Sequence, residues 1–335
     1  MEDNTQELDW SKAQGVVITV DLVKAAKRQL QFLAAVDSAH CLYDGPALDH
    51  AIDRYKYCWL PLLAKHALSP ITTEPLVVPL DCEWIWHCHR LNPVQYKNDC
   101  EEIYGRILDN IYVLSTTEGT CTRKTEWIWS KMYPSEPYHL ERCCHSMLGA
   151  IDTDIGQEKS TKYDLVAAVK KQSSFFHKVS KSIVQDDCFL REAVTRYKAF
   201  LHLIKIKNER SIKSFVVPTY DIDLMWHSHQ LNPVSYCWIL DHDDRSSDSS
   251  KLKTGFTETS KLWEDTFGRR CFMAKSTFEG DGRSTKCFDN KVEITGCGTT
   301  CIEGAPHPPP CGTTCLAGDP QPPPCGTTCL AGDSI

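Results

Sequence analysis

The chain has 335 residues, of which 41% are hydrophobic, and a formal net charge of −7 at pH 7. This length and composition can bury one large or two modest hydrophobic cores, which excludes a chain that is disordered throughout. The acidic balance argues against a protein that coats duplex nucleic acid or a membrane surface, because such proteins need a basic face.

Residues 1–17 show no hydrophobic periodicity, and we expect them to form a partly ordered leader. Their acidic, polar composition does not fit a signal peptide or an Arg-rich transit peptide. No run of 18 apolar residues occurs in the chain, so no membrane-spanning helix is expected. The predicted location is the cytoplasm, with the nucleus left open.

Two helices are predicted after the leader. The first begins at Asp21, a favourable N-cap residue, and is followed by apolar residues at helical spacing. The second spans 46–66 after a Gly-Pro break, with a kink or an early end expected at Pro61. A proline-rich connector at 69–79 is predicted to be extended.

Residues 81–96 carry a motif that recurs at 221–236, with the pattern D-x-[DE]-x-x-W-H-x-H-x-L-N-P-V-x-Y. We call these two copies the WHxH motifs. A match of this length does not recur by chance, so the chain contains an internal duplication. Upstream, Arg54-Tyr-Lys also recurs, as Arg196-Tyr-Lys. Each motif is predicted to form two short helices joined at a tight corner, because its Asn-Pro step suits a second helix start.

Helical periodicity continues in both halves. The first half is predicted to stay helical to about Leu108 and to add a short helix at 122–132; the second repeats helices near 163–180, 187–206, 221–230, 233–241 and 257–270. The predicted organisation is a leader at 1–17, helical unit 1 at 18–142, a linker at 143–161, helical unit 2 at 162–272, a short extended segment at 273–296 and a tail at 297–335. The predicted fold class is all-α, with two homologous helical units packed together.

The tail repeats Cys-Gly-Thr-Thr-Cys three times, with proline runs between the copies. Because it has almost no large apolar residues, we expect it to be extended and disordered. Two interpretations stay open: a solvated tail without a defined ligand, or thiolate binding of a divalent metal such as Zn. The candidate ligands are Cys297, Cys301, Cys311, Cys315, Cys325 and Cys329.

The WHxH motifs place histidines near carboxylates, and both groups are ligands of Zn, Fe or Mn. On a helix, Glu83 with His87 and Asp223 with His227 fall four residues apart, which would pair each imidazole with a carboxylate and raise its pKa. One hypothesis is a metal site that these four residues share between the two units. The other is a packing role.

The packing hypothesis rests on the same helical spacing. His89 and His229 fall on the face that carries the apolar residues of each motif, so they are predicted to point into the core. The chain contains no phosphate-binding glycine loop, nucleophile elbow, H-E-x-x-H or RNP-type motif. The sequence therefore predicts no catalytic residues and a non-enzymatic protein, with a metal-dependent enzyme as the competing class.

The doubled motif resembles the plant glycine-rich domain-containing protein family over about residues 15–272. Other shared features are Trp263-Glu-x-x-Phe-Gly-Arg269, Tyr104-Gly-Arg106 and Tyr133-Pro-Ser-Glu-Pro-Tyr138. The resemblance implies a regulatory or scaffold role in plant development and in osmotic, abscisic-acid and auxin-linked responses. Protein partners are expected, with RNA, which some members of the family are described as binding, as a weaker alternative; the acidic composition argues against DNA or a membrane. After about Val292 the sequence departs from the family, whose longer members continue into a further domain and a Gly-rich tail.

Overall fold

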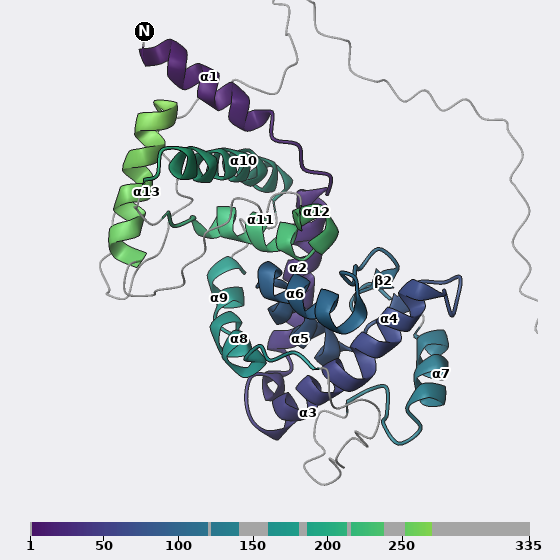
Figure 1. The fold of residues 1–335 in the computed structure, drawn as a ribbon. Helices are drawn as coiled ribbons and strands as arrows, with labels where there is room; N and C mark the ends of the chain where they lie inside the picture. Colours follow the sequence, from purple (N-terminus) through teal and green to yellow (C-terminus); the bar gives the residue numbers. More distant parts are fainter. Residues whose placement is uncertain are drawn as a thin grey trace, which may run out of the picture. The chain divides into compact units, whose positions relative to one another are not determined.

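The computed structural model describes residues 2–119, 122–140, 160–180, 186–212, 216–237 and 252–269. All of these residues belong to one unit, Met1–Phe278. Their regular structure is almost entirely helical (Figure 1), as the all-α prediction requires. In the described part of the chain, no helix is both long enough and apolar enough to cross a membrane.

The duplication appears as two repeats of helices. The first comprises α2 (Leu22–Asp37), η1 (His40–Leu42), α3 (Pro46–Arg54), the π-turn η2 (Tyr55–Trp59), α4 (Leu60–Leu68), α5 (Leu80–Arg90), α6 (Pro93–Tyr104) and α7 (Arg123–Met132). The second comprises α8 (Leu165–Gln172), α9 (Phe175–Val179), α10 (Asp187–Glu209), α11 (Tyr220–Gln230), α12 (Pro233–Cys237) and α13 (Leu252–Phe267). Two short parallel strands, β1 (Leu76–Val77) and β2 (Val113–Leu114), pair within the first repeat.

The predicted helix start at Asp21 is confirmed. Asp21 caps α2 by accepting from the Lys24 backbone N–H at 3.1 Å, and Asp164 caps α8 in the same way through Ala167 at 2.9 Å. The motif corner forms as expected in the first repeat, where Asn92 is the N-cap residue of α6. These caps show that the two repeats share their local structure as well as their sequence.

Several predicted helix ends differ from the structure. The helix that contains Pro61 does not end there, since α4 continues to Leu68; the irregularity lies just before it, where the π-turn directs the Leu60 N–H to Tyr55 O. Helix α6 ends before Leu108, because Gly105 adopts a left-handed conformation with a φ of 69°. The predicted helix at 163–180 is divided between α8 and α9.

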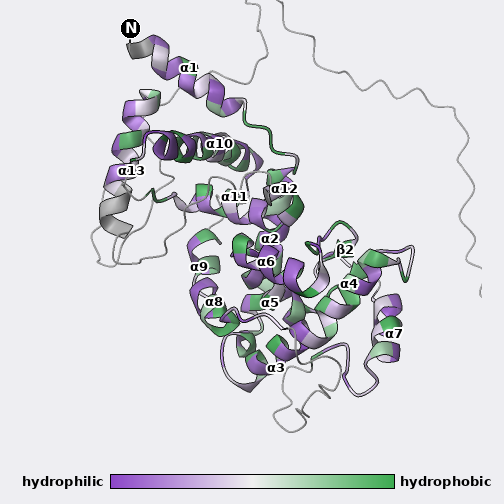
Figure 2. Cartoon of the chain, viewed as in Figure 1, coloured by the Kyte–Doolittle hydropathy of each residue, from purple (hydrophilic) through white to green (hydrophobic). Residues whose placement is uncertain are grey.

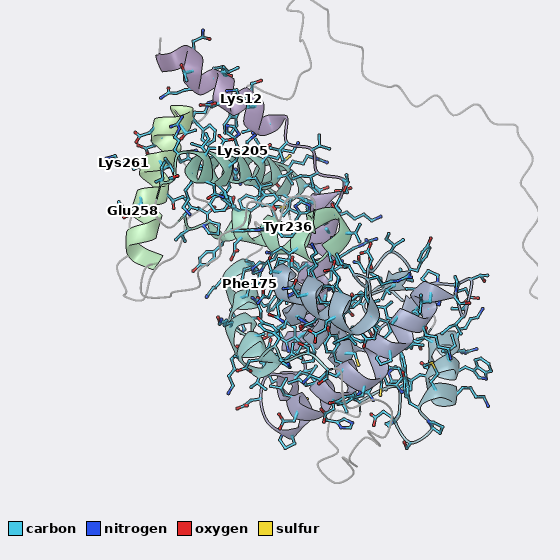
Figure 3. All side chains as sticks on the ribbon, viewed as in Figure 1. Lys12, Phe175, Lys205, Tyr236, Glu258 and Lys261 are labelled. Atoms are coloured by element: carbon cyan, nitrogen blue, oxygen red, sulfur yellow. The ribbon has the colours of Figure 1, made fainter. Side chains whose placement is uncertain are left out.

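The leader also differs from expectation, because residues Glu2–Gln14 form helix α1. This helix packs on α10 and α13 of the second repeat. Trp10 contacts Phe267 edge to face, with 5.6 Å between ring centroids. Charged residues such as Lys205 on α10 and Lys261 on α13 stay on the exposed sides of their helices (Figure 3). The predicted tail, most of the predicted linker and the segment 273–296 lie outside the described residues.

The opening helix of each repeat packs on the other repeat. Helix α2 packs on α10 and α11, whereas α8 packs on α3 and α5. Two hydrogen bonds from hydroxyl groups also join the repeats. Thr19 bonds to Ser235 at 2.7 Å, and Thr161 donates to Asp99. The two repeats therefore share one core, because the opening helix of each repeat is buried against helices of the other.

The core is continuous across the repeats and rich in aromatic residues. Its largest side chains with under 2% exposure include Trp59, Trp84, Trp86 and Trp129 of the first repeat. Hydrophobic and hydrophilic residues alternate around most helices (Figure 2), which is the pattern of helices that pack on one face and meet water on the other.

Candidate functional site

The WHxH motifs build the same hydrogen-bonded frame in each repeat. The Tyr55 hydroxyl lies 2.9 Å from Nδ1 of His89, and the Tyr197 hydroxyl lies 3.0 Å from Nδ1 of His229. Both histidines are buried, as the sequence predicted. Burial lowers the pKa of His229 to about 4, so its imidazole is neutral at physiological pH.

The tryptophan of each motif has an equally regular partner. Trp86 donates from Nε1 to the Tyr96 hydroxyl at 2.9 Å, and Trp226 donates to Tyr236 at 2.8 Å. All four side chains are buried. A buried indole N–H left without an acceptor would be costly, which explains why each motif ends in a tyrosine.

The aspartate that begins each motif binds an arginine. In the first repeat Arg54, with no exposed surface, donates from Nε to Asp81 at 2.6 Å and also contacts the Glu136 carboxylate and the Tyr138 carbonyl. This assigns a structural role to the Tyr-Pro-Ser-Glu-Pro-Tyr segment, which supplies the second carboxylate. In the second repeat Arg196 binds Asp221, also at 2.6 Å.

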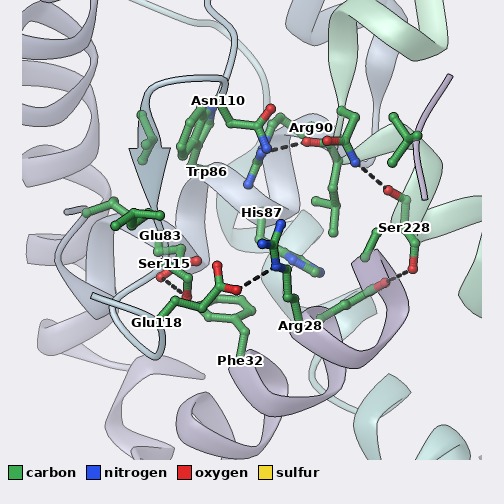
Figure 4. Close-up of a pocket in the computed structure, with 18 of the residues that line it drawn as sticks. Arg28, Phe32, Glu83, Trp86, His87, Arg90, Asn110, Ser115, Glu118 and Ser228 are labelled. Carbon is green, nitrogen blue, oxygen red and sulfur yellow. Dashed lines mark hydrogen bonds and ion pairs between the residues drawn. The ribbon is translucent and has the colours of Figure 1, made fainter. Parts of the chain in front are cut away.

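A cavity of about 400 Å³ lies between the two repeats (Figure 4). Residues of α2 and α5, the loop around β2, and the end of α11 with its corner line this cavity. Ser228 donates to Gln29 across it at 2.8 Å, and Arg90 donates from Nη1 to the Leu231 carbonyl at 2.7 Å. We call it the inter-repeat cleft. It exists because each opening helix crosses to the other repeat.

Glu83 lies in the inter-repeat cleft, but it does not pair with His87 as the helical spacing suggested. Its carboxylate accepts 3.0 Å hydrogen bonds from the Ser115 hydroxyl and the Thr116 backbone N–H. Burial raises the pKa of Glu83 to about 7, although these two hydrogen bonds oppose the shift. The loop after β2 therefore binds the Glu83 carboxylate, which the helical spacing had paired with the His87 imidazole.

His87 is buried against aromatic rings. Phe32 and Trp84 lie 5.3 and 5.6 Å from it between ring centroids, and its Nε2 has no hydrogen-bond partner among the described residues. Burial, together with the charges of Arg90 and His227, lowers the pKa of His87 well below its usual range. The expected rise in its pKa is therefore wrong, because no carboxylate contacts the ring.

In the second motif the expected pair forms. Asp223 Oδ1 lies 3.5 Å from His227 Nε2, and Phe175 packs on the His227 ring at 4.4 Å between centroids. The four residues of the predicted metal site are thus brought together in part: the two imidazoles are close enough to interact electrostatically, while the carboxylates have partners of their own.

The predicted metal sites stay predictions. Within the described ranges, no three His, Cys, Asp or Glu side chains are grouped closely enough to hold a metal ion. The six tail cysteines, Cys297, Cys301, Cys311, Cys315, Cys325 and Cys329, lie outside those ranges.

Sequence reasoning missed Arg90 and Gln29. Arg90 is 6% exposed, stacks on the Trp86 ring with its guanidinium carbon 3.9 Å from the centroid, and has no carboxylate within ion-pair distance in the described residues. One signal was available: the otherwise matching motifs carry Arg90 in one copy and Gln230 in the other. Gln29 offered no such signal, since only the tertiary structure places it opposite Ser228.

Comparisons with known proteins agree with this architecture. A family model described as glycine-rich domain-containing protein-like matches residues 1–99 and 95–238, and each matched region contains one WHxH motif. Glycine-rich domain-containing protein 1 of Arabidopsis thaliana is 53% identical over 291 residues, which are 83% of this chain and 36% of that protein. Glycine-rich domain-containing protein 2 of the same plant is 54% identical over 292 residues, covering 84% and 37%.

The chain spans little more than a third of the length of these relatives. No solved structure matches it. Because the family model covers both repeats, the chain belongs to the glycine-rich domain-containing protein-like family.

Proposed function

We propose that the chain is a non-enzymatic regulatory or scaffold protein that acts in plant development and in abiotic stress responses. The non-enzymatic part of this proposal is supported by the hydrogen bonds of the motif residues inside the fold. Arg54, His89 and Trp86 each bind a partner inside the fold, and their counterparts in the second repeat bind equivalent partners. Residues held in this way position helices and are not available to a substrate.

The relatives support the regulatory part of the proposal. They are plant proteins almost three times as long as the matched region, so that region is only a part of each of them. A rigid helical module within a longer chain suits a scaffold, because it presents one fixed surface while other segments reach further partners. RNA is less well supported than protein as a partner, because the chain is acidic and lacks an RNP motif.

The test is genetic complementation in a plant that lacks the gene. We expect altered growth under osmotic stress or abscisic acid, restored by the wild-type chain and by the exposed-surface variant Lys205→Gln. Arg54→Ala should fail to restore it, because the buried charges of Asp81 and Glu136 would lose their partner. Unaltered growth of the plant without the gene, under each stress and in normal development, would refute the proposed role.

One observation favours the competing metal-binding hypothesis. His87 and His227 come from different repeats and still lie close enough to affect each other's charge. Metal analysis of the purified protein separates the two hypotheses.

A further inference from the structure

Three buried nitrogen atoms in residues that line the inter-repeat cleft have no hydrogen-bond partner among the described residues. They are Gln29 Nε2, His87 Nε2 and Arg90 Nε. The three side chains are 3%, 1% and 6% exposed, and each comes from a helix of the first repeat. Gln29 Nε2 and Arg90 Nε are donors, and the neutral His87 imidazole donates from Nε2 in one of its two tautomers. Buried donors normally have acceptors, so these nitrogens at one cavity indicate a group that accepts hydrogen bonds there.

Arg90 presents the geometry that fits a carboxylate. Its Nη1 is already used by the Leu231 carbonyl, and Trp86 covers one face of the guanidinium. This leaves the edge formed by Nε and Nη2, whose two N–H groups are parallel. A guanidinium edge of this kind binds the two oxygens of a carboxylate with two parallel hydrogen bonds.

The charges around the cleft also favour an anion. Three carboxylates line it: Glu83 is held by Ser115 and Thr116, Glu118 by Arg28 at 2.5 Å, and Asp21 accepts a hydrogen bond from the Lys24 backbone N–H. The Arg90 guanidinium has no carboxylate partner in the described part of the chain, and Lys24 is an exposed cation at the cleft. Asp21 and Lys24 are exposed to water, so Arg90 is the buried charge of the cleft that has no carboxylate against it among the residues that the structure describes.

Part of the remaining lining is apolar and suits an organic body. The buried side chains Phe32 and Trp86 line the cleft (Figure 4). Val78, which is also buried, and Leu114 of β2 line the same cavity. A volume of about 400 Å³ is within the range of small-molecule sites, and mixed apolar walls with a few polar groups are typical of them.

We propose that the inter-repeat cleft binds a small organic carboxylate, with its carboxylate on Arg90, Gln29 and His87 and its apolar body against Phe32, Val78 and Trp86. This inference deepens the proposed function by naming what the regulatory module binds, and in that sense it rests on it. Because the cleft is formed by both repeats, the bound molecule would hold them together.

The test is isothermal titration calorimetry of the full chain with benzoate and hexanoate, and with their neutral amides as size-matched controls. Saturation-transfer NMR detects the weakest complexes. We expect both carboxylates to bind with dissociation constants in the millimolar range or below, and the amides at least about tenfold more weakly, because they lack the charge that pairs with Arg90. Equal binding of acids and amides, or no binding of either acid, would overturn the proposal.

Two variants locate the site. Arg90→Gln introduces the residue that the second motif carries at the equivalent position, Gln230, and should reduce carboxylate affinity at least about tenfold. Lys24→Gln changes only an exposed cation and should weaken binding less. Lys205→Gln, on the exposed side of α10, is the matched control and should leave affinity unchanged. Unchanged affinity in Arg90→Gln that retains its helical circular dichroism would refute the site.

Inorganic phosphate distinguishes a carboxylate site from a general anion site. It should compete with benzoate poorly; competition at equal concentration would overturn the assignment to an organic carboxylate. These results are independent of plant growth. If the chain restores plant growth but binds no carboxylate, this inference alone is refuted. If the chain binds carboxylates but its loss changes no growth response, only the proposed function is refuted.

Discussion

Arg54 donates from Nε to Asp81 over 2.6 Å with neither side chain more than 3% exposed. Glu136 adds a second carboxylate to the same guanidinium. The equivalent Arg196 of the second repeat is 13% exposed, and its second carboxylate partner, Glu192, is 70% exposed. One repeat thus buries a charge network that the other leaves partly in water.

This difference predicts unequal costs of the same substitution. Arg54→Ala should lower the free energy of unfolding by about 3–5 kcal/mol, because it leaves Asp81 buried without its ion-pair partner and Glu136 buried with only His50. Arg196→Ala should cost about 1–2 kcal/mol, since water can reach part of that site. Urea denaturation followed by circular dichroism measures both, and equal losses would contradict the assignment. If Arg54→Ala does not fold, Arg54→Lys against Arg196→Lys gives the same ranking.

The hydroxyls of Tyr55 and Tyr197 should be worth similar amounts. Tyr55→Phe and Tyr197→Phe each leave an imidazole Nδ1 without this partner, and each should lower the free energy of unfolding by about 1–2 kcal/mol. Tyr57 is the matched control, because no hydrogen bond of its hydroxyl occurs in the described residues, and Tyr57→Phe should change little. A loss in the control as large as in Tyr55→Phe would show that the hydroxyl–imidazole bond is not the cause.

Glu83 should make stability depend on pH. Its pKa is about 7 when folded against 4.5 when unfolded, so the folded protein binds the extra proton between these values. The stabilisation from this carboxyl is full below about pH 4.5 and is lost as the pH rises to about 7. Glu83→Gln cannot titrate, so relative to wild type it should gain stability across this window. The upper limit of this gain is about 3 kcal/mol, at about 1.4 kcal/mol for each pKa unit.

Urea denaturation at several pH values between 4.5 and 8 tests this expectation. Glu74→Gln, which removes a carboxylate whose side chain is 62% exposed, is the control. Glu118 and Arg90 also act on Glu83, the first raising and the second lowering its pKa, so both are kept unchanged in these measurements. A constant difference between wild type and Glu83→Gln at every pH would contradict the raised pKa.

Metal content should be low in the helical unit. Protein purified without a histidine tag should retain less than one equivalent of Zn, Fe or Mn once the six tail cysteines are replaced by serine. The physical reason is that Glu83 is held by Ser115 and Thr116, and Asp223 by His227, so the predicted ligands do not share one point. Elemental mass spectrometry is the measurement. One equivalent that is lost in His87→Ala would reverse this expectation and support the metal hypothesis.

Helix α1 should contribute to the stability of the second repeat. Trp10→Ala removes a ring that packs on Phe267 and lies under the Arg269 guanidinium, whose carbon is 4.6 Å from the centroid. We expect a loss of about 2–3 kcal/mol in the free energy of unfolding. Leu8→Ala, at a side chain that is 54% exposed on the same helix, is the control and should cost far less. Equal, small effects would indicate a leader that does not pack.

Much of the local structure could be predicted from the sequence alone. The cap at Asp21, the helical motif cores and the inward position of His89 and His229 follow from residue type and spacing, which act over a few positions. The duplication could likewise be read directly, because Trp and His recur in the same order. The packing of α1 could not, since its apolar residues are too few for a periodic stripe.

The tertiary structure decided which groups meet. Helical spacing assigned Glu83 to His87, but the loop after β2 supplies Ser115 and Thr116, which lie more than 30 positions away. Likewise, Gln29 meets Ser228 only because α2 crosses to the second repeat. The sequence by itself determined the helices and their doubling, which depend on local interactions. The inter-repeat cleft and its unpaired nitrogens form because the opening helix of each repeat packs on the other repeat. This packing joins residues far apart in the sequence and leaves no periodic signal in the chain.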